Sequence, residues 1–115
     1  MIIGFSENTS KLLPRILCKT PRHCAPIVRT RKNYYIMFQF VRRGNIAQIA
    51  LNKRQMSLLK AYGWIFIDVG DSYRVNISEH IYNAKSCVDL CKRSIGMHAP
   101  FIQTPRALYK KIKRP

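Results

Sequence analysis

The fold of this chain is best predicted from the stretch SCVDLCKRSIG, residues 86–96. Apolar residues recur along it at helical spacing, and Gly96 is a typical residue for ending a helix. The stretch therefore predicts a short helix from Cys87 to Ile95 that carries a cysteine at its N-terminus. Further on, Thr104 and Pro105 are typical of a helix start, so we expect a basic C-terminal helix and tail from about residue 104.

Upstream, alternation and turn residues predict a single α+β domain over residues 1–115. The predicted strands cover residues 2–6, 23–29, 34–42, 46–51, 64–69 and 73–77, and those between 23 and 51 form an antiparallel meander. One helix is expected from residue 9 or 10 to about 18. Another is expected from Asn52 to Gly63, because Gln55 follows Asn52 at the spacing of a capping box. A chain of this length buries roughly two thirds of its unfolded surface in one core.

Cys87 is the first candidate for a functional residue. A thiol is a nucleophile only as the thiolate, and the unpaired N–H groups at a helix N-terminus lower the pKa of a thiol. Cys91 lies one turn further along, where this effect has faded, so we assign Cys91 to the core. Position alone fits equally well with Cys87 as a small buried packing residue.

Four motifs follow one another along the chain in an order that is typical of one family. They are Ile3-Gly4-Phe5-Ser6, Arg22-His23-Cys24-Ala25, Ser86-Cys87-Val88-Asp89-Leu90 and Thr104-Pro105-Arg106-Ala107-Leu108-Tyr109. In this order the chain resembles the circularly permuted branch of the NlpC-type papain-like cysteine hydrolases, in which the histidine strand precedes the cysteine helix. The resemblance covers most of the chain and implies a papain-like fold, with an antiparallel sheet packed against helices. It also implies a thiol hydrolase that acts on an amide, peptide or acyl bond.

The resemblance implies that His23 is the base opposite Cys87, with a third polar group on the next strand. Alternation along the strand turns His23 toward a packed helix and Cys24 away from it. Gln39 is the polar side chain within the apolar run of the next strand, so we expect its amide oxygen to orient His23. An outward-facing Gln39 on an exposed strand face is the alternative. Pro26 removes a backbone donor and predicts a bulge or a sheet edge close to His23.

Charge leads to a second hypothesis. The chain has 21 Lys and Arg against 5 Asp and Glu, which gives a formal net charge of +16. The C-terminus is the most basic part, with Arg106, Lys110, Lys111, Lys113 and Arg114. Such an excess predicts a polyanionic partner, which is nucleic acid, an anionic membrane face or an acidic polymer, although a solvated surface that only keeps the protein soluble is the alternative. The rival to the hydrolase is therefore a non-catalytic, strongly basic papain-like scaffold that binds nucleic acid within a larger assembly, such as a virus particle or a ribonucleoprotein.

Other kinds of chemistry have little support in the sequence. The four cysteines have Cys-x5-Cys and Cys-x3-Cys spacings instead of the Cys-x2-Cys pairs typical of structural zinc, so no metal is expected. The sequence contains no glycine-rich loop of the kind that binds the phosphates of a nucleotide, so we expect no cofactor. The cysteines are few for a disulfide-rich secreted domain, and neither a signal peptide nor an apolar run of ~18 residues is seen. We expect free thiols, no membrane span, and a protein that stays in the cytoplasm or is packaged from there into an assembly.

Overall fold

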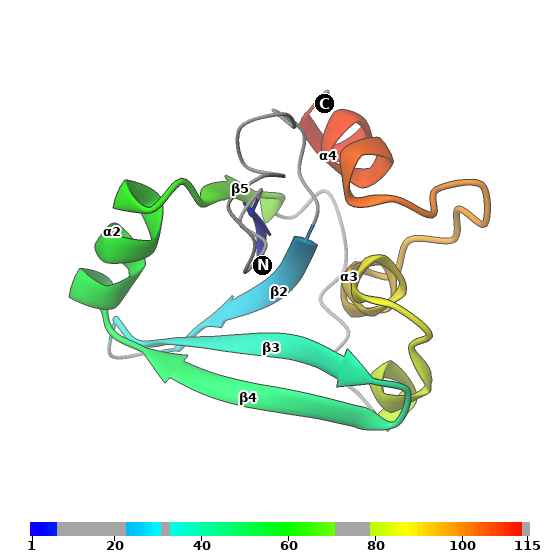
Figure 1. Cartoon of the computed structure of the whole chain (residues 1–115), viewed down its shortest axis with the longest axis horizontal. Helices are drawn as coiled ribbons and strands as arrows, with labels where there is room; N and C mark the ends of the chain where they lie inside the picture. Colours follow the sequence, from blue (N-terminus) through cyan, green and yellow to red (C-terminus); the bar gives the residue numbers. More distant parts are fainter. Residues whose placement is uncertain (7–22, 31–32, 71–78, 114–115) are drawn as a thin grey trace, which may run out of the picture.

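The structure of the protein is a computed structural model, and it describes residues 1–6, 23–30, 33–70 and 79–113. Over these ranges the chain forms an α+β fold with one five-stranded antiparallel sheet and three α-helices (Figure 1). The predicted α+β class and the antiparallel sheet are thus confirmed. The helix expected from residue 9 or 10 to 18 and the strand expected over 73–77 lie outside the described residues. None of the helices in these ranges has both the length and the apolar character that crossing a bilayer requires.

The order of the strands across the sheet differs from their order in the chain. The strands are β1 (Ile2–Ser6), β2 (His23–Arg29), β3 (Tyr35–Arg42), β4 (Asn45–Leu51) and β5 (Ile65–Asp68). Across the sheet they follow the order β4-β3-β2-β1-β5. The predicted meander between residues 23 and 51 is confirmed as β2-β3-β4, and β1 pairs with both β2 and β5. The strand that begins with His23 therefore lies in the middle of the sheet.

Local sequence signals set the ends of the helices. The helices are α2 (Lys53–Ala61), the 3-10 helix η2 (Glu79–Asn83), α3 (Cys87–Ile95) and α4 (Pro105–Lys113). The predicted capping box starts α2, because Asn52 and Gln55 each accept a hydrogen bond at 2.8 Å from the other's backbone N–H. Gly96 ends α3 with a φ of 69°, a left-handed conformation that glycine adopts without strain. At the start of α4, Thr104 Oγ1 accepts from the backbone N–H of Ala107 at 3.1 Å. The helices predicted in these ranges are confirmed.

The first half of β2 is paired on one side only. β1 pairs with it from His23 to Ile27, whereas the pairing with β3 covers only Ile27–Arg29. Pro26 directly precedes the part that pairs with β3, and a proline has no N–H to donate to a neighbouring strand. The edge expected at Pro26 is therefore local: the β2–β3 ladder ends there although β2 lies in the middle of the sheet, while the pairing with β1 runs through Pro26 without a register shift. Figure 1 shows β2 and β3 diverging on the side where α3 lies.

Both faces of the sheet are covered by helices, and this explains one wrong expectation. One core cluster joins β1 and β2 to α3 and α4, with members that include Ile3, Phe5, Cys24, Val88, Cys91, Ile95 and Leu108. A second cluster joins the other face to α2, through Ala25, Ile27, Met37 and Met56. Cys24 was expected to face away from the packed helix, but it is fully buried against α3. Because β2 has a helix on each face, alternation alone could not decide which of its residues face α3.

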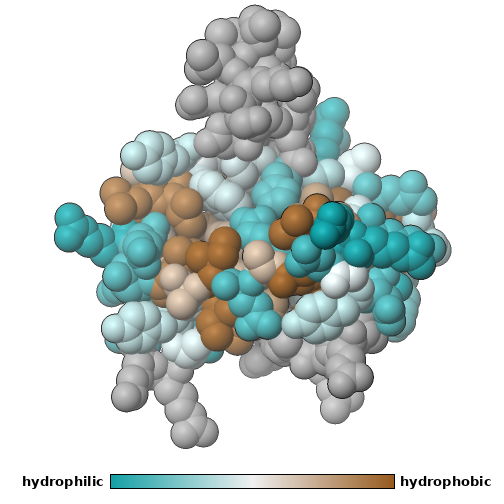
Figure 2. Space-filling model, turned by 60° about the horizontal axis from the view of Figure 1, so that its bottom comes forward, coloured by the Kyte–Doolittle hydropathy of each residue, from teal (hydrophilic) through white to brown (hydrophobic). Residues whose placement is uncertain are grey.

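β4 is the last strand on one side of the described sheet, and it carries no charged residue. Ile49 on β4 is 41% exposed, and Val41 on β3 is 58% exposed. Figure 2 shows hydrophobic side chains gathered on the face that this side of the sheet turns outward, with hydrophilic groups at either end. This edge therefore lacks the charged side chains with which edge strands usually avoid pairing with other chains.

Candidate active site

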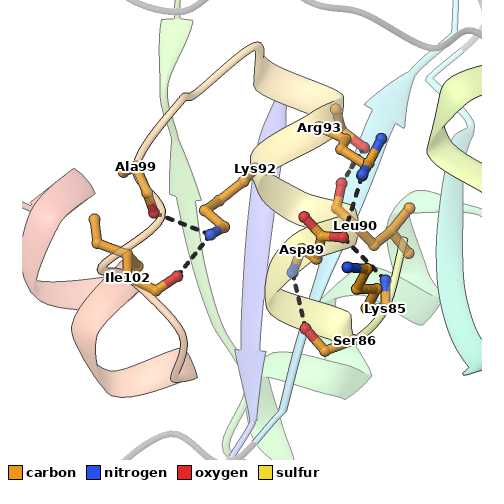
Figure 3. Close-up of polar contacts among 9 residues, drawn as sticks. Lys85, Ser86, Asp89, Leu90, Lys92, Arg93, Ala99 and Ile102 are labelled. Atoms are coloured by element: carbon orange, nitrogen blue, oxygen red, sulfur yellow. Dashed lines mark hydrogen bonds and ion pairs between the residues drawn. The ribbon is translucent and has the colours of Figure 1, made fainter. Parts of the chain in front are cut away.

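Polar contacts hold the start of α3, where Cys87 lies. Ser86 Oγ accepts a hydrogen bond from the backbone N–H of Asp89 at 3.1 Å, as an N-cap residue does. The Asp89 carboxylate accepts from the backbone N–H of Lys85 at 2.9 Å and from Arg93 Nε at 3.1 Å (Figure 3). These contacts fix the first turn of the helix. Cys87 is the first residue of that turn, and its part-buried side chain packs against the core cluster shared by α3 and α4.

His23 is held in place by a hydrogen bond to Gln39. The distance from His23 Nε2 to Gln39 Oε1 is 2.6 Å. The amide nitrogen of Gln39 donates to the sulfur of Met37 at 2.9 Å, so the amide oxygen is the end that faces His23. Because that oxygen can only accept, Nε2 of His23 carries a proton and Nδ1 is left for another partner. The ring of Trp64 meets the imidazole edge to face, with centroids 6.2 Å apart.

Cys87 shares a side-chain hydrogen bond with His23, whose Nδ1 is not used by Gln39. Hydrogen bonds lower the pKa of Cys87 to about 4 against the effect of burial: the largest is from the side chain of Cys24, and the others come from the side chain of His23 and the backbone of Cys24. The pKa of His23 is raised, chiefly by its hydrogen bond to Cys87 and further by Gln39, although burial opposes the rise. Between these two pKa values the pair exists as thiolate and imidazolium.

Cys24 belongs to the site, although sequence reasoning left it out. Its side chain and its backbone both hydrogen-bond to Cys87. The pKa of Cys24 is raised, first by the hydrogen bond to Cys87, then by that to Cys91 and by burial, so its thiol keeps the proton that it shares with Cys87. The signal that could have found it is its place next to His23. Because a central strand with a helix on each face can bury successive side chains, Cys24 could be expected to contact a helix as well as His23.

The predicted site residues thus come together from three separate elements. Cys87 is at the start of α3, His23 is the first residue of β2, and Gln39 lies on β3 beyond the part that pairs with β2. The divergence of β2 and β3 gives the N-terminus of α3 access to His23. Gln39 is part-buried and bonded at both ends of its amide, so the alternative of a free, outward-facing side chain does not describe it.

A cavity of about 480 Å³ beside α3 does not include the site. It is lined by residues of α3 and of the loop that follows, among them Asp89, Lys92, Met97 and Pro100. Lys92 Nζ donates to the backbone oxygens of Ala99 at 3.0 Å and Ile102 at 2.7 Å (Figure 3). Lys92 therefore holds the loop between α3 and α4, and none of the three candidate site residues lines this cavity.

The basic residues of the C-terminal helix form a surface of their own. Leu108 and Ile112 are the buried residues of α4. The exposed basic residues, which we call the α4 basic face, are Arg106, Lys110, Lys111 and Lys113. Lys113 Nζ lies 5.1 Å from the centroid of the Tyr109 ring. Arg114, also expected to bind a polyanion, lies outside the described residues.

Comparison with known proteins assigns no family to the chain. No family model, no curated protein and no solved structure matches it. Within the described ranges, no three His, Cys, Asp or Glu side chains are grouped in a way that could hold a metal ion. The chemistry of the site is therefore inferred from its own residues.

Proposed function

We propose that the protein is a thiol hydrolase with a papain-like fold of the circularly permuted NlpC type. The observation that carries this proposal is the chain of hydrogen bonds from Cys87 through His23 to Gln39. A nucleophile, a base within hydrogen-bond reach and a third group that orients the base are what nucleophilic catalysis by a side chain needs. The order of the histidine strand before the cysteine helix, and the antiparallel sheet between helices, support the proposed fold.

The first half of the reaction makes an acyl-enzyme. The Cys87 thiolate attacks the carbonyl carbon of an amide, peptide or other acyl group, and the carbonyl oxygen takes the negative charge. Backbone N–H groups in the first turn of α3, which have no partner within a helix, are suited to stabilise that oxyanion. The tetrahedral intermediate collapses as the His23 imidazolium protonates the leaving group. The products are a thioester on Cys87 and a neutral His23.

The second half of the reaction releases the acyl group. Neutral His23 takes a proton from a water molecule, whose oxygen attacks the thioester carbonyl carbon. The bond between carbon and sulfur breaks, so the carboxylic acid leaves and Cys87 returns as a thiolate beside an imidazolium. Gln39 keeps the imidazole oriented through both halves. Its neutral amide stabilises the imidazolium less than a carboxylate would. Stabilisation of the Cys87 thiolate by Cys24 and by the N-terminus of α3 is therefore more important here.

An activated ester tests this proposal directly. With p-nitrophenyl acetate in excess, we expect a burst of nitrophenolate that matches the enzyme concentration, followed by slower turnover, because acylation precedes hydrolysis. Mass spectrometry of the quenched protein should place the acetyl group on Cys87. A burst with the acetyl group on a lysine or on another cysteine would contradict the proposed nucleophile.

We propose nucleic-acid binding as a second function, because the exposed residues of α4 provide a specific surface for it. The α4 basic face brings four cationic side chains together on one short helix that contains no acid. The chain has 21 basic and 5 acidic residues, so few carboxylates are present to pair with these cations in place of phosphate groups. A non-catalytic scaffold in a virus particle or ribonucleoprotein would use this surface alone, whereas an enzyme could use it to stay near a polyanion.

The salt dependence of binding tests the second function. For duplex DNA we expect the logarithm of affinity to fall linearly with the logarithm of salt concentration, with a slope of roughly −0.9 for each phosphate contact. Replacing Lys110 and Lys111 by glutamine should flatten that slope by up to about 1.8. The matched control replaces Lys53 and Lys60, two exposed lysines of α2. Equal flattening in both variants would mean that binding follows net charge and not the α4 basic face, and an affinity independent of salt would exclude the polyanion.

A further inference from the structure

Three thiols meet where β2 packs on α3. Cys24 and Cys91 are fully buried in one core cluster, and part-buried Cys87 packs against that cluster. All three are free cysteines. The hydrolase chemistry uses only one sulfur as a nucleophile. The second thiol, which is hydrogen-bonded to that sulfur, is therefore available for a separate reaction.

Geometry selects Cys24, and not Cys91, as the sulfur that can bond to Cys87. Cys87 and Cys91 are one turn apart on α3, and residues at this spacing have Cβ atoms about 5–6 Å apart. A disulfide needs Cβ atoms about 3.5–4.5 Å apart. A rigid helix therefore keeps Cys91 out of reach of Cys87. Cys24 comes from β2, which packs against α3 in the same core cluster, and its side chain is hydrogen-bonded to Cys87.

We propose that Cys24 is a resolving thiol, so that oxidation of Cys87 by a hydroperoxide ends in a Cys24–Cys87 disulfide. This inference depends on the nucleophilic sulfur of Cys87 but not on any hydrolytic activity. It adds a redox modification site to the same pair of elements, β2 and α3.

The two steps balance in atoms and electrons. The Cys87 thiolate attacks one oxygen of the hydroperoxide, the O–O bond breaks, and the departing alkoxide or hydroxide takes the proton of the His23 imidazolium. Cys87 is then a sulfenic acid, and the hydroperoxide has been reduced to an alcohol or water. The Cys24 thiol attacks the Cys87 sulfur, the S–O bond breaks, and hydroxide leaves as water with the Cys24 proton. Two thiols have lost two electrons to one hydroperoxide.

The sulfurs of Cys87 and Cys24 have different roles in this oxidation because their environments differ. Cys87 is part-buried and carries the lowered pKa, so it is the sulfur that a hydroperoxide reaches as a thiolate. Cys24 is fully buried, and its raised pKa keeps it protonated until a sulfenic acid forms beside it. The disulfide would hold Cys87 in a form that a dithiol can reduce. Without Cys24, further peroxide would carry Cys87 to sulfinic acid, which thiols do not reverse.

Peptide mapping of the reduced full-length protein after stoichiometric hydrogen peroxide tests the proposal. The expected product is a peptide pair linked through Cys24 and Cys87, lighter by two hydrogen atoms than the separate peptides and reversed by dithiothreitol. In the Cys24→Ala variant, dimedone should trap sulfenic acid on Cys87, and prolonged exposure should yield sulfinic acid. The Cys91→Ala and Cys18→Ala variants are the controls, and both should still form the disulfide.

Two results would overturn the resolving role of Cys24. One is a wild-type protein in which Cys87 passes to sulfinic acid without forming a disulfide. The other is a disulfide that joins Cys87 to a cysteine other than Cys24. Both are read from the wild-type protein, so a variant that fails to fold does not hide the answer. Because peptide mapping needs no substrate, a failed ester burst and a failed disulfide are separate outcomes.

Discussion

Replacing Cys87 by alanine is expected to lower kcat/KM for an acyl substrate roughly 10⁴-fold or more, because the variant lacks the atom that bonds to substrate. A residual rate over water can remain from the oxyanion-stabilising N–H groups and from substrate binding. Steady-state hydrolysis of an activated ester and of a peptide amide would measure the loss. The folded state should be kept, since the Cys87 side chain is only part-buried.

Cys91→Ala is the matched control for loss of a thiol from α3. Cys91 is fully buried in the core cluster that β1 and β2 share with α3 and α4. We expect this variant to lose some stability, since a buried side chain is truncated, but to keep its turnover. Turnover that survives in Cys87→Ala and vanishes in Cys91→Ala would reverse the assignment of the nucleophile.

Replacing His23 by alanine should lower kcat/KM roughly 10²- to 10⁴-fold, the range that a general acid–base contributes. Two effects combine here. The leaving group and the attacking water lose their proton donor and acceptor, and Cys87 loses one of the hydrogen bonds that lower its pKa. The pH at which Cys87 becomes reactive should therefore rise in the same variant, which alkylation kinetics would measure without any substrate.

Gln39→Ala is expected to lower kcat/KM less than His23→Ala does, and to change the pH dependence of activity. Acylation needs the Cys87 thiolate and the His23 imidazolium, so activity should appear above a pH of about 4 and fade above the raised pKa of His23. The hydrogen bond to Gln39 helps to raise that pKa, so without it the alkaline limit moves to lower pH. An unchanged alkaline limit would mean that Gln39 does not act through His23.

Much of the fold could be predicted because local signals were strong. The capping box at Asn52 and Gln55, the glycine after Ile95 and the Thr104-Pro105 pair each have a short-range physical cause, and each marks a helix end in the structure. The divergence of β2 from β3 could not be predicted in the same way. It depends on how α3 packs on strands that are far from it in sequence, and Pro26 alone was compatible with a bulge or an edge.

The site was predictable in part for a similar reason. Gln39 was predictable because the family resemblance implies a polar group on the strand after His23, and Gln39 is the polar side chain within that strand's apolar run. In the structure it meets His23, as a polar side chain in an apolar strand has to meet a partner or water. Cys24 was missed because alternation assigns one face of a strand to the core and the other to the outside. β2 has a core on both faces, so a residue that alternation turned away from one helix was turned toward another.

The most direct test of the proposed catalytic pair is the pH dependence of Cys87 alkylation by iodoacetamide, resolved residue by residue with mass spectrometry. A thiol stabilised as thiolate by Cys24 and His23 should have its reactivity midpoint at a pH of about 4 and stay fully reactive at neutral pH. Cys24 and Cys91, fully buried, should label far more slowly in the folded protein. A Cys87 midpoint near the ordinary thiol pKa of about 8.5 would contradict the thiolate–imidazolium pair and the hydrolase with it.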